Sequence, residues 1–162
     1  MKFRRTPLAA LTLSAAALVG IAVHEGYRDR AYYATPHERS AGISTIGFGT
    51  TAGVKPGDTI TVERALIRLL SDAEQFQRQL KDCIGEVPLY QHEWDAYVSW
   101  AYNVGAGAAC RSTLVRKLRQ TPPDYAGACA ELLRWTKQNG RELAGLVKRR
   151  ADEYRLCMGQ EK

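Results

Sequence analysis

A chain of 162 residues with a net charge of +6 and four cysteines is long enough to form one domain, or one domain with two lobes. The excess of positive charge indicates an anionic partner such as a cell-wall polymer or a lipid surface. No basic run reaches five residues, which argues against a nucleic-acid-binding arm, so we expect no nucleic-acid partner.

The first 23 residues have the pattern of an export segment. Lys2, Arg4 and Arg5 form a basic start, and no charged residue follows until after Val23. The uncharged stretch is close to the roughly 20 apolar residues that span a bilayer. It is rich in Ala, Gly, Thr and Ser, which contribute little transfer energy, so a membrane would hold it weakly.

Three interpretations of this segment remain open. It is a signal peptide cleaved near Ser14-Ala15-Ala16, a permanent anchor, or an anchor that later leaves the bilayer. The weak apolarity favours the third. In each case the positive-inside rule places the rest of the chain outside the cytoplasm.

The remaining elements follow in chain order from periodicity and turn residues. We expect one helix from about residue 8 to 30, then a small antiparallel sheet within residues 32–58, where glycines alternate with β-forming residues. An amphipathic helix is predicted over 61–82. Further helices are predicted over 91–103, 111–119, 124–135 and 142–157. The fold class is therefore α+β: a small α/β lobe with a short antiparallel sheet, joined by a long helix to a helical lobe, with a cleft between the lobes.

The four cysteines are Cys83, Cys110, Cys129 and Cys157, and none has the spacing of a zinc site. An even number in an exported chain predicts two disulfides. Three pairings are possible; we favour Cys110–Cys129 with Cys83–Cys157, and four free thiols are the alternative. Histidines are isolated and no H-E-x-x-H, P-loop or dinucleotide motif occurs, so we expect no metal and no cofactor.

Glu25 is the strongest catalytic candidate. It follows the apolar residues Ile21, Ala22 and Val23 at a predicted helix end. Apolar surroundings favour the protonated form of a carboxyl, and a general acid must be protonated to act. In glycoside hydrolysis, such an acid protonates the leaving oxygen while a second group handles water or the sugar cation.

A set of motifs in order along the chain resembles the phage-type lysozymes, glycoside hydrolase family 24, over nearly all of residues 24–158. The motifs are Glu25-Gly26-Tyr27-Arg28, Ala31-Tyr32, Thr45-Ile46-Gly47-Phe48-Gly49-Thr50, Tyr102-Asn103-Val104-Gly105, Arg111-Ser112-Thr113-Leu114, Leu132-Leu133-Arg134-Trp135 and Gly145-Leu146-Val147-Lys148-Arg149-Arg150. Each motif is weak alone, but their order and separations together are specific. The resemblance implies a lysozyme-like fold.

The resemblance also implies roles for individual residues. Glu25 would be the general acid and Thr45 would position the attacking water. The family usually places an Asp or Cys nine residues after the catalytic Glu, and here that position is Ala34, in a longer loop. Glu38 in this loop is the candidate for the second carboxylate, the alternative being a solvated loop residue; Asp29 is a weaker candidate. The resemblance further implies that Arg149 or Arg150 pairs with Glu25.

The resemblance implies an endolysin. It would be an N-acetylmuramidase that hydrolyses the β-1,4 bond between N-acetylmuramic acid and N-acetylglucosamine in peptidoglycan and so lyses the bacterial host. Alternatives are a lytic transglycosylase and a catalytically weakened wall-binding protein. We expect a monomer with a signal-anchor-release segment over 1–23 and a lysozyme-like catalytic domain over 24–162. It would be tethered to the host inner membrane and then released into the periplasm.

Overall fold

The computed structural model describes residues 4–160, so Lys2 of the predicted basic start lies outside the described residues. The chain divides into two compact units. We name Leu18–Glu74 the sheet unit, and the described residues up to Ala17 and from Gln75 onward the helical unit.

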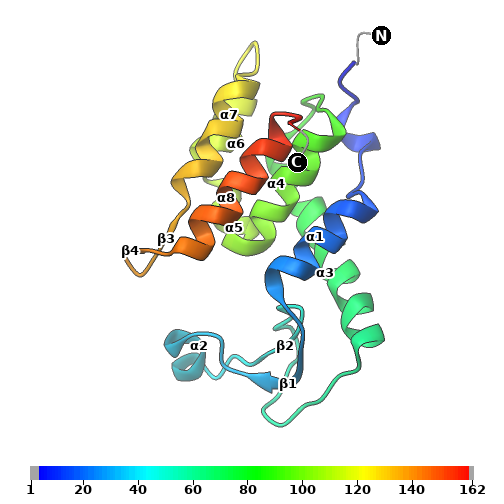
Figure 1. The fold of residues 1–162 in the computed structure, drawn as a ribbon. Helices are drawn as coiled ribbons and strands as arrows, with labels where there is room; N and C mark the ends of the chain where they lie inside the picture. Colours follow the sequence, from blue (N-terminus) through cyan, green and yellow to red (C-terminus); the bar gives the residue numbers. More distant parts are fainter. Residues whose placement is uncertain (1–3, 161–162) are drawn as a thin grey trace. The chain divides into compact units, whose positions relative to one another are not determined.

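The described residues form ten helices and four short strands (Figure 1). The helices are η1 (Leu8–Ala10), α1 (Ala15–Glu25), α2 (Pro36–Ala41), α3 (Val62–Ile84), α4 (Gln91–Val104), α5 (Ala106–Cys110), α6 (Thr113–Leu118), α7 (Tyr125–Glu131), η2 (Leu132–Arg134) and α8 (Ala144–Cys157). The strands are β1 (Arg28–Tyr32), β2 (Thr45–Gly47), β3 (Lys137–Gln138) and β4 (Arg141–Glu142).

The sheet unit contains the predicted small antiparallel sheet. Strand β1 pairs with β2, placing Arg28 opposite Gly47 and Tyr32 opposite Thr45. The connection between them holds the short helix α2 where a loop was expected. Its signals are local: the Thr35 side chain accepts a hydrogen bond at the helix start, and Gly42 ends the helix with a left-handed φ of 68°.

The helix predicted over about 8–30 is shorter than expected. One turn of 3-10 helix covers Leu8–Ala10, and α1 itself runs only from Ala15 to Glu25. It ends there because Gly26 adopts a φ of +69°, which other residues rarely take. The chain then enters β1, so Glu25 stands at the junction of helix and strand.

The predicted long helix over 61–82 is confirmed as α3, Val62–Ile84. The buried residues Ala65, Leu69, Ala73 and Leu80 recur at helical spacing. The boundary between the two units falls inside this helix, at Glu74. The structure thus has the α+β composition that the sequence predicts, with a short antiparallel sheet and mostly helices elsewhere among the described residues.

The helical unit is built around α4. This helix packs against α8, and α8 also contacts α7 and η2. Trp94, Tyr97 and Trp100 of α4 are fully buried, and the Trp100 and Trp135 rings meet edge to face with centroids 5.3 Å apart. The helix predicted over 142–157 is confirmed as α8, and it begins two residues later than expected, at Ala144, because Glu142 belongs to β4. Strand β4 pairs with β3 in a hairpin whose turn residues, Asn139 and Gly140, take positive φ angles.

All four cysteines are paired, which confirms two disulfides, but the favoured pairing was wrong. The structure joins Cys83 to Cys110 and Cys129 to Cys157. Each bridge closes a loop of similar size, with sequence separations of 27 and 28 residues. Loop-closure entropy predicts a stabilisation of about 3–4 kcal/mol for each.

Within residues 4–160, none of the helices combines the length and the apolarity that crossing a bilayer requires.

Candidate active site

The three predicted site residues, Glu25, Glu38 and Thr45, all belong to the sheet unit. Glu25 is the last residue of α1, Glu38 lies in the first turn of α2, and Thr45 begins β2. Thr45 is buried, while Glu25 and Glu38 are partly exposed. The site is thus assembled from the end of one helix, the start of a second and a strand.

The Glu38 carboxylate is held by two donors on one oxygen. Oε2 accepts from the backbone N–H of Ala34 at 2.6 Å and from the Thr45 hydroxyl at 3.2 Å. The Glu38 backbone is fixed as well, because its N–H donates to Oγ1 of Thr35, the residue that caps α2. These contacts keep the carboxylate beside β2 and the chain segment that follows β1.

The contact with Ala34 bears directly on the departure seen in the sequence. Position 34 is where the resemblance leads us to expect an acidic or thiol side chain, and the methyl of Ala34 supplies neither. The backbone of the same residue instead binds the carboxylate of Glu38. A carboxylate is therefore present next to position 34, contributed by α2.

Tyr32 links the two acidic residues electrostatically. Burial raises the pKa of Tyr32, Arg28 lowers it, and the negative charges of Glu25 and Glu38 raise it further. The phenol of Tyr32 therefore senses the charge of both carboxylates. Tyr32 is also the β1 partner of Thr45. In the sequence Tyr32 is only part of a motif, and its place opposite Thr45 depends on the register of the sheet.

The strand that carries Thr45 is fixed by close packing and by its following turn. A Cβ added at Gly47 would lie 3.0 Å from the Cβ of Ala65, and Gly47 has a φ of +64°. Beyond the turn, the Thr50 hydroxyl donates to Asp72 of α3 at 2.5 Å. Gly47 thus allows β2 to approach α3 closely, and this packing helps to hold Thr45 in place.

The weaker candidate Asp29 lies exposed on β1, where its carbonyl accepts from the N–H of Ile60 at 2.9 Å. His37 is exposed in α2. Among residues 4–160, no group of three or more His, Cys, Asp or Glu side chains is placed to hold a metal ion.

Arg149 and Arg150 form a buried ion-pair network with Glu153 in the helical unit. The Nε atoms of Arg149 and Arg150 lie 3.1 and 3.0 Å from the two Glu153 oxygens. Arg150 also donates to Asn103 at 2.8 Å. Burial raises the pKa of Glu153, and Arg150 and Arg149 lower it. The pairing of either arginine with Glu25 stays a prediction.

Comparison with known proteins gives consistent matches along the chain. The sequence model of the family described as phage lysozyme matches residues 22–153. An endolysin of Acyrthosiphon pisum secondary endosymbiont phage 1 is 40% identical over 148 residues, covering 89% of this chain and 96% of the relative. A SAR-endolysin of Pseudomonas phage phiKMV is 36% identical over 148 residues, and the match covers 89% of this chain and 87% of the relative.

A solved structure gives the same result. The muramidase domain of SpmX from Asticaccaulis excentricus aligns with a TM-score of 0.80 at 29% identity, and the match covers 91% of this chain and 98% of that domain. The matches in sequence and in structure confirm the resemblance that the motifs indicated.

Proposed function

Because this chain belongs to the phage lysozyme family and is a glycoside hydrolase, we propose that Glu25, Glu38 and Thr45 form its active site. The enzyme is an endolysin, a muramidase that hydrolyses the β-1,4 bond between N-acetylmuramic acid and N-acetylglucosamine in peptidoglycan. The observation that carries this function is the family match over residues 22–153, which includes all three site residues. The net charge of +6 suits a partly anionic polymer.

In the proposed mechanism Glu25 is the general acid. Its protonated carboxyl donates to the oxygen that leaves the sugar, and positive charge develops on the ring. The junction of α1 and β1 supports this role, because it fixes the backbone on both sides of Glu25.

Glu38 and Thr45 handle the water. The Thr45 hydroxyl donates its one hydrogen to Glu38 Oε2. Its lone pairs remain able to accept a hydrogen bond from a water molecule. The Glu38 carboxylate next to it takes the second proton of that water as its oxygen attacks the sugar carbon. The position of Glu38 against the backbone of Ala34 supports its role as the second carboxylate.

The products distinguish this reaction from the two alternatives. Purified peptidoglycan digested by the protein is expected to yield muropeptides with reducing N-acetylmuramic acid ends, read by mass spectrometry. Anhydro-muramic ends would identify a lytic transglycosylase, which needs one Glu and no second carboxylate. An absence of soluble products would indicate a wall-binding protein instead.

We further propose that residues 1–23 are a signal-anchor-release segment and residues 24–162 the catalytic domain. Relatives named SAR-endolysins, including that of Pseudomonas phage phiKMV, support this proposal, as do the basic start and the Ala-rich composition. The enzyme is exported, tethered to the host inner membrane, and freed into the periplasm when the membrane potential collapses. It acts there as a monomer.

The structure provides positions at which this proposal can be tested without disturbing the folded protein. Ala10, Ala15 and Ala16 are exposed in the helical unit. Replacing all three with Leu is expected to strengthen membrane insertion by about 2 kcal/mol for each residue. The variant should stay in the membrane fraction after depolarisation and fail to lyse the host.

The matched control is the same three positions changed to Ser, which keeps the segment weakly apolar. This control should be released and should lyse cells as the wild type does. Lysis by the Leu variant on the wild-type schedule would contradict release from the bilayer as the activating step.

A further inference from the structure

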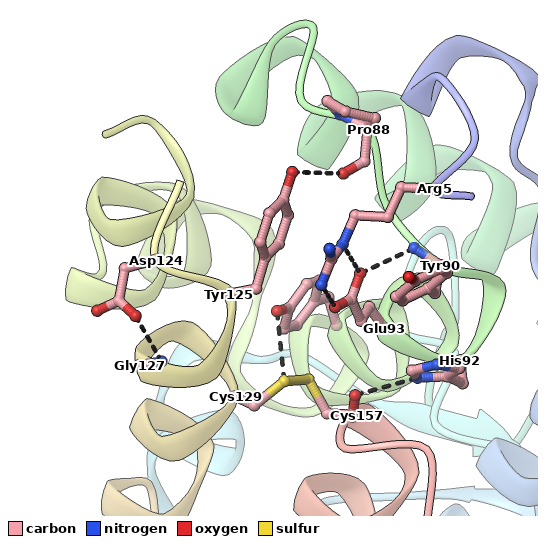
Figure 2. Close-up of polar contacts among 11 residues, drawn as sticks. Arg5, Pro88, Tyr90, His92, Glu93, Asp124, Tyr125, Gly127, Cys129 and Cys157 are labelled. Carbon is pink, nitrogen blue, oxygen red and sulfur yellow. Dashed lines mark hydrogen bonds and ion pairs between the residues drawn. A yellow bond between two sulfur atoms is a disulfide. The ribbon is translucent and has the colours of Figure 1, made fainter. Parts of the chain in front are cut away.

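Arg5, from the basic start of the export segment, is bound in a pocket of the helical unit (Figure 2). Its Nε and Nη2 atoms donate to the two carboxylate oxygens of Glu93 at 3.1 and 2.7 Å. Its guanidinium carbon lies 3.5 Å from the centre of the Tyr125 ring and 4.4 Å from that of Tyr90. A guanidinium is thus held by one bidentate carboxylate and by two aromatic rings.

Glu93 is not a surface partner. Its side chain is 4% exposed, against 28% for Arg5. Its Oε2 also accepts from the backbone N–H of Tyr90 and so caps α4. A carboxylate buried to this extent is costly without a cation, so the pocket is incomplete until Arg5 enters it.

The residues after Arg5 continue the same interface. Thr6 and Leu89 exchange two backbone hydrogen bonds of 2.8 and 2.9 Å, and Leu8 and Leu11 are buried. Further along, the N–H of Leu13 donates to Gln77 at 2.6 Å and that of Ser14 to Asp95 at 2.9 Å. The contacts that begin at Arg5 therefore continue along the chain as far as Ser14.

Both residues of one disulfide border the Arg5 pocket. The cavity beside Arg5 has a volume of about 220 Å³ and is lined by Tyr90, Glu93 and Tyr125 together with Cys129 and Cys157. The pocket is thus formed by α4, α7 and the end of α8, and the Cys129–Cys157 bridge joins the last two of these helices. Apart from Arg5 itself, the residues that line the cavity all lie between Tyr90 and Met158, well after the export segment.

We propose that Glu93, Tyr90 and Tyr125 form an arginine-recognition site that captures the N-terminal segment when it leaves the membrane. This inference rests on the release mechanism proposed above. In the tethered state Arg5 supplies positive charge on the cytoplasmic side, a task that Lys performs equally well. In the released state the same residue fills the pocket, and this second task requires the planar fork and stacking surface of Arg.

Arg5→Lys separates the two tasks, because it keeps the charge and removes the fork. In purified full-length protein, amide hydrogen exchange at Thr6, Leu13 and Ser14 is expected to rise about tenfold over the wild type, while amides of α4 and α8 keep their protection. In cells, the variant should occupy the inner membrane as the wild type does and lyse more slowly after depolarisation. Arg4→Lys is the matched control, since Arg4 is exposed, and it should change neither measurement.

Glu93→Gln provides a second variant whose amide oxygen can still cap α4. If Arg5 acts through Glu93, Arg5→Lys should add little to the exchange rates in the Glu93→Gln background. Wild-type exchange in Arg5→Lys, equal effects of Arg4→Lys, or fully additive effects with Glu93→Gln would each overturn the recognition site. A different result would show that the release mechanism itself is wrong: the wild-type protein would be absent from the membrane fraction before depolarisation.

Discussion

Glu25→Gln is expected to lower the rate of peptidoglycan cleavage by about 10²- to 10⁴-fold, the usual contribution of a general acid. Glutamine has nearly the same shape, so the junction of α1 and β1 should be retained, but its amide has no acidic proton for the leaving oxygen. The measurement is the rate of release of reducing muropeptides, with the thermal unfolding midpoint determined on the same samples.

The control for this variant is Glu74→Gln, which removes an exposed carboxylate from α3 in the same unit. It loses the same charge and should keep wild-type activity. Equal loss in both variants would assign the effect to net charge and substrate attraction; wild-type activity in Glu25→Gln would remove Glu25 from the reaction.

Glu38→Gln is expected to reduce the rate by about 10²-fold or more with little change in stability. The amide oxygen of glutamine can still accept from the Ala34 N–H and the Thr45 hydroxyl, so the local geometry is preserved. The substitution removes the carboxylate that we propose takes the proton from water. Rates of peptidoglycan hydrolysis measured from pH 4 to 8 would show the loss of one ionisation from the profile.

Asp29→Asn discriminates between the candidates for the second carboxylate. A large loss in this variant with normal activity in Glu38→Gln would transfer the role to Asp29. Near-normal activity in both would mean that Glu25 and a water held by Thr45 are sufficient for catalysis, and that Glu38 only fastens α2 to its neighbours.

The sequence predicts an element well where apolar residues recur at regular spacing or where Gly and Pro clearly end it. The apolar residues Ala65, Leu69 and Ala73 recur at helical spacing and predict a helix. The predicted range 61–82 is close to the observed α3, Val62–Ile84. Helix α2 was missed because six residues are too few for a periodic pattern, although Thr35-Pro36 at its start and Gly42 at its end are recognisable cap residues.

The disulfide pairing was beyond the reach of the sequence for a different reason. A bridge requires Cα atoms about 5–6 Å apart, and this distance depends on which helices become neighbours. The pairing of Cys83 with Cys110 follows from how α3 ends relative to α5, with Cα atoms 5.6 Å apart. Nothing in the spacing of the cysteines distinguishes that arrangement from the other two.

The candidate site lies between these cases. Glu25 and Thr45 are the candidates that the motifs indicate, and the structure places them at a helix end and at the start of a strand. Glu38 could only be proposed, because a carboxylate in a lengthened loop has no fixed direction until the loop folds. The Thr35 cap and the hydrogen bonds from Ala34 and Thr45 supply that direction.

The two disulfides follow one another along the chain without crossing or nesting. Cys83 finds its partner in the next cysteine, Cys110, before Cys129 and Cys157 are needed. A chain that is translocated from its N-terminal side can therefore oxidise each pair in the order in which the thiols emerge. No temporary bond to an earlier cysteine has to be broken when a later one arrives, so the native covalent framework can be reached by oxidation alone, without an enzyme that reshuffles wrong pairs.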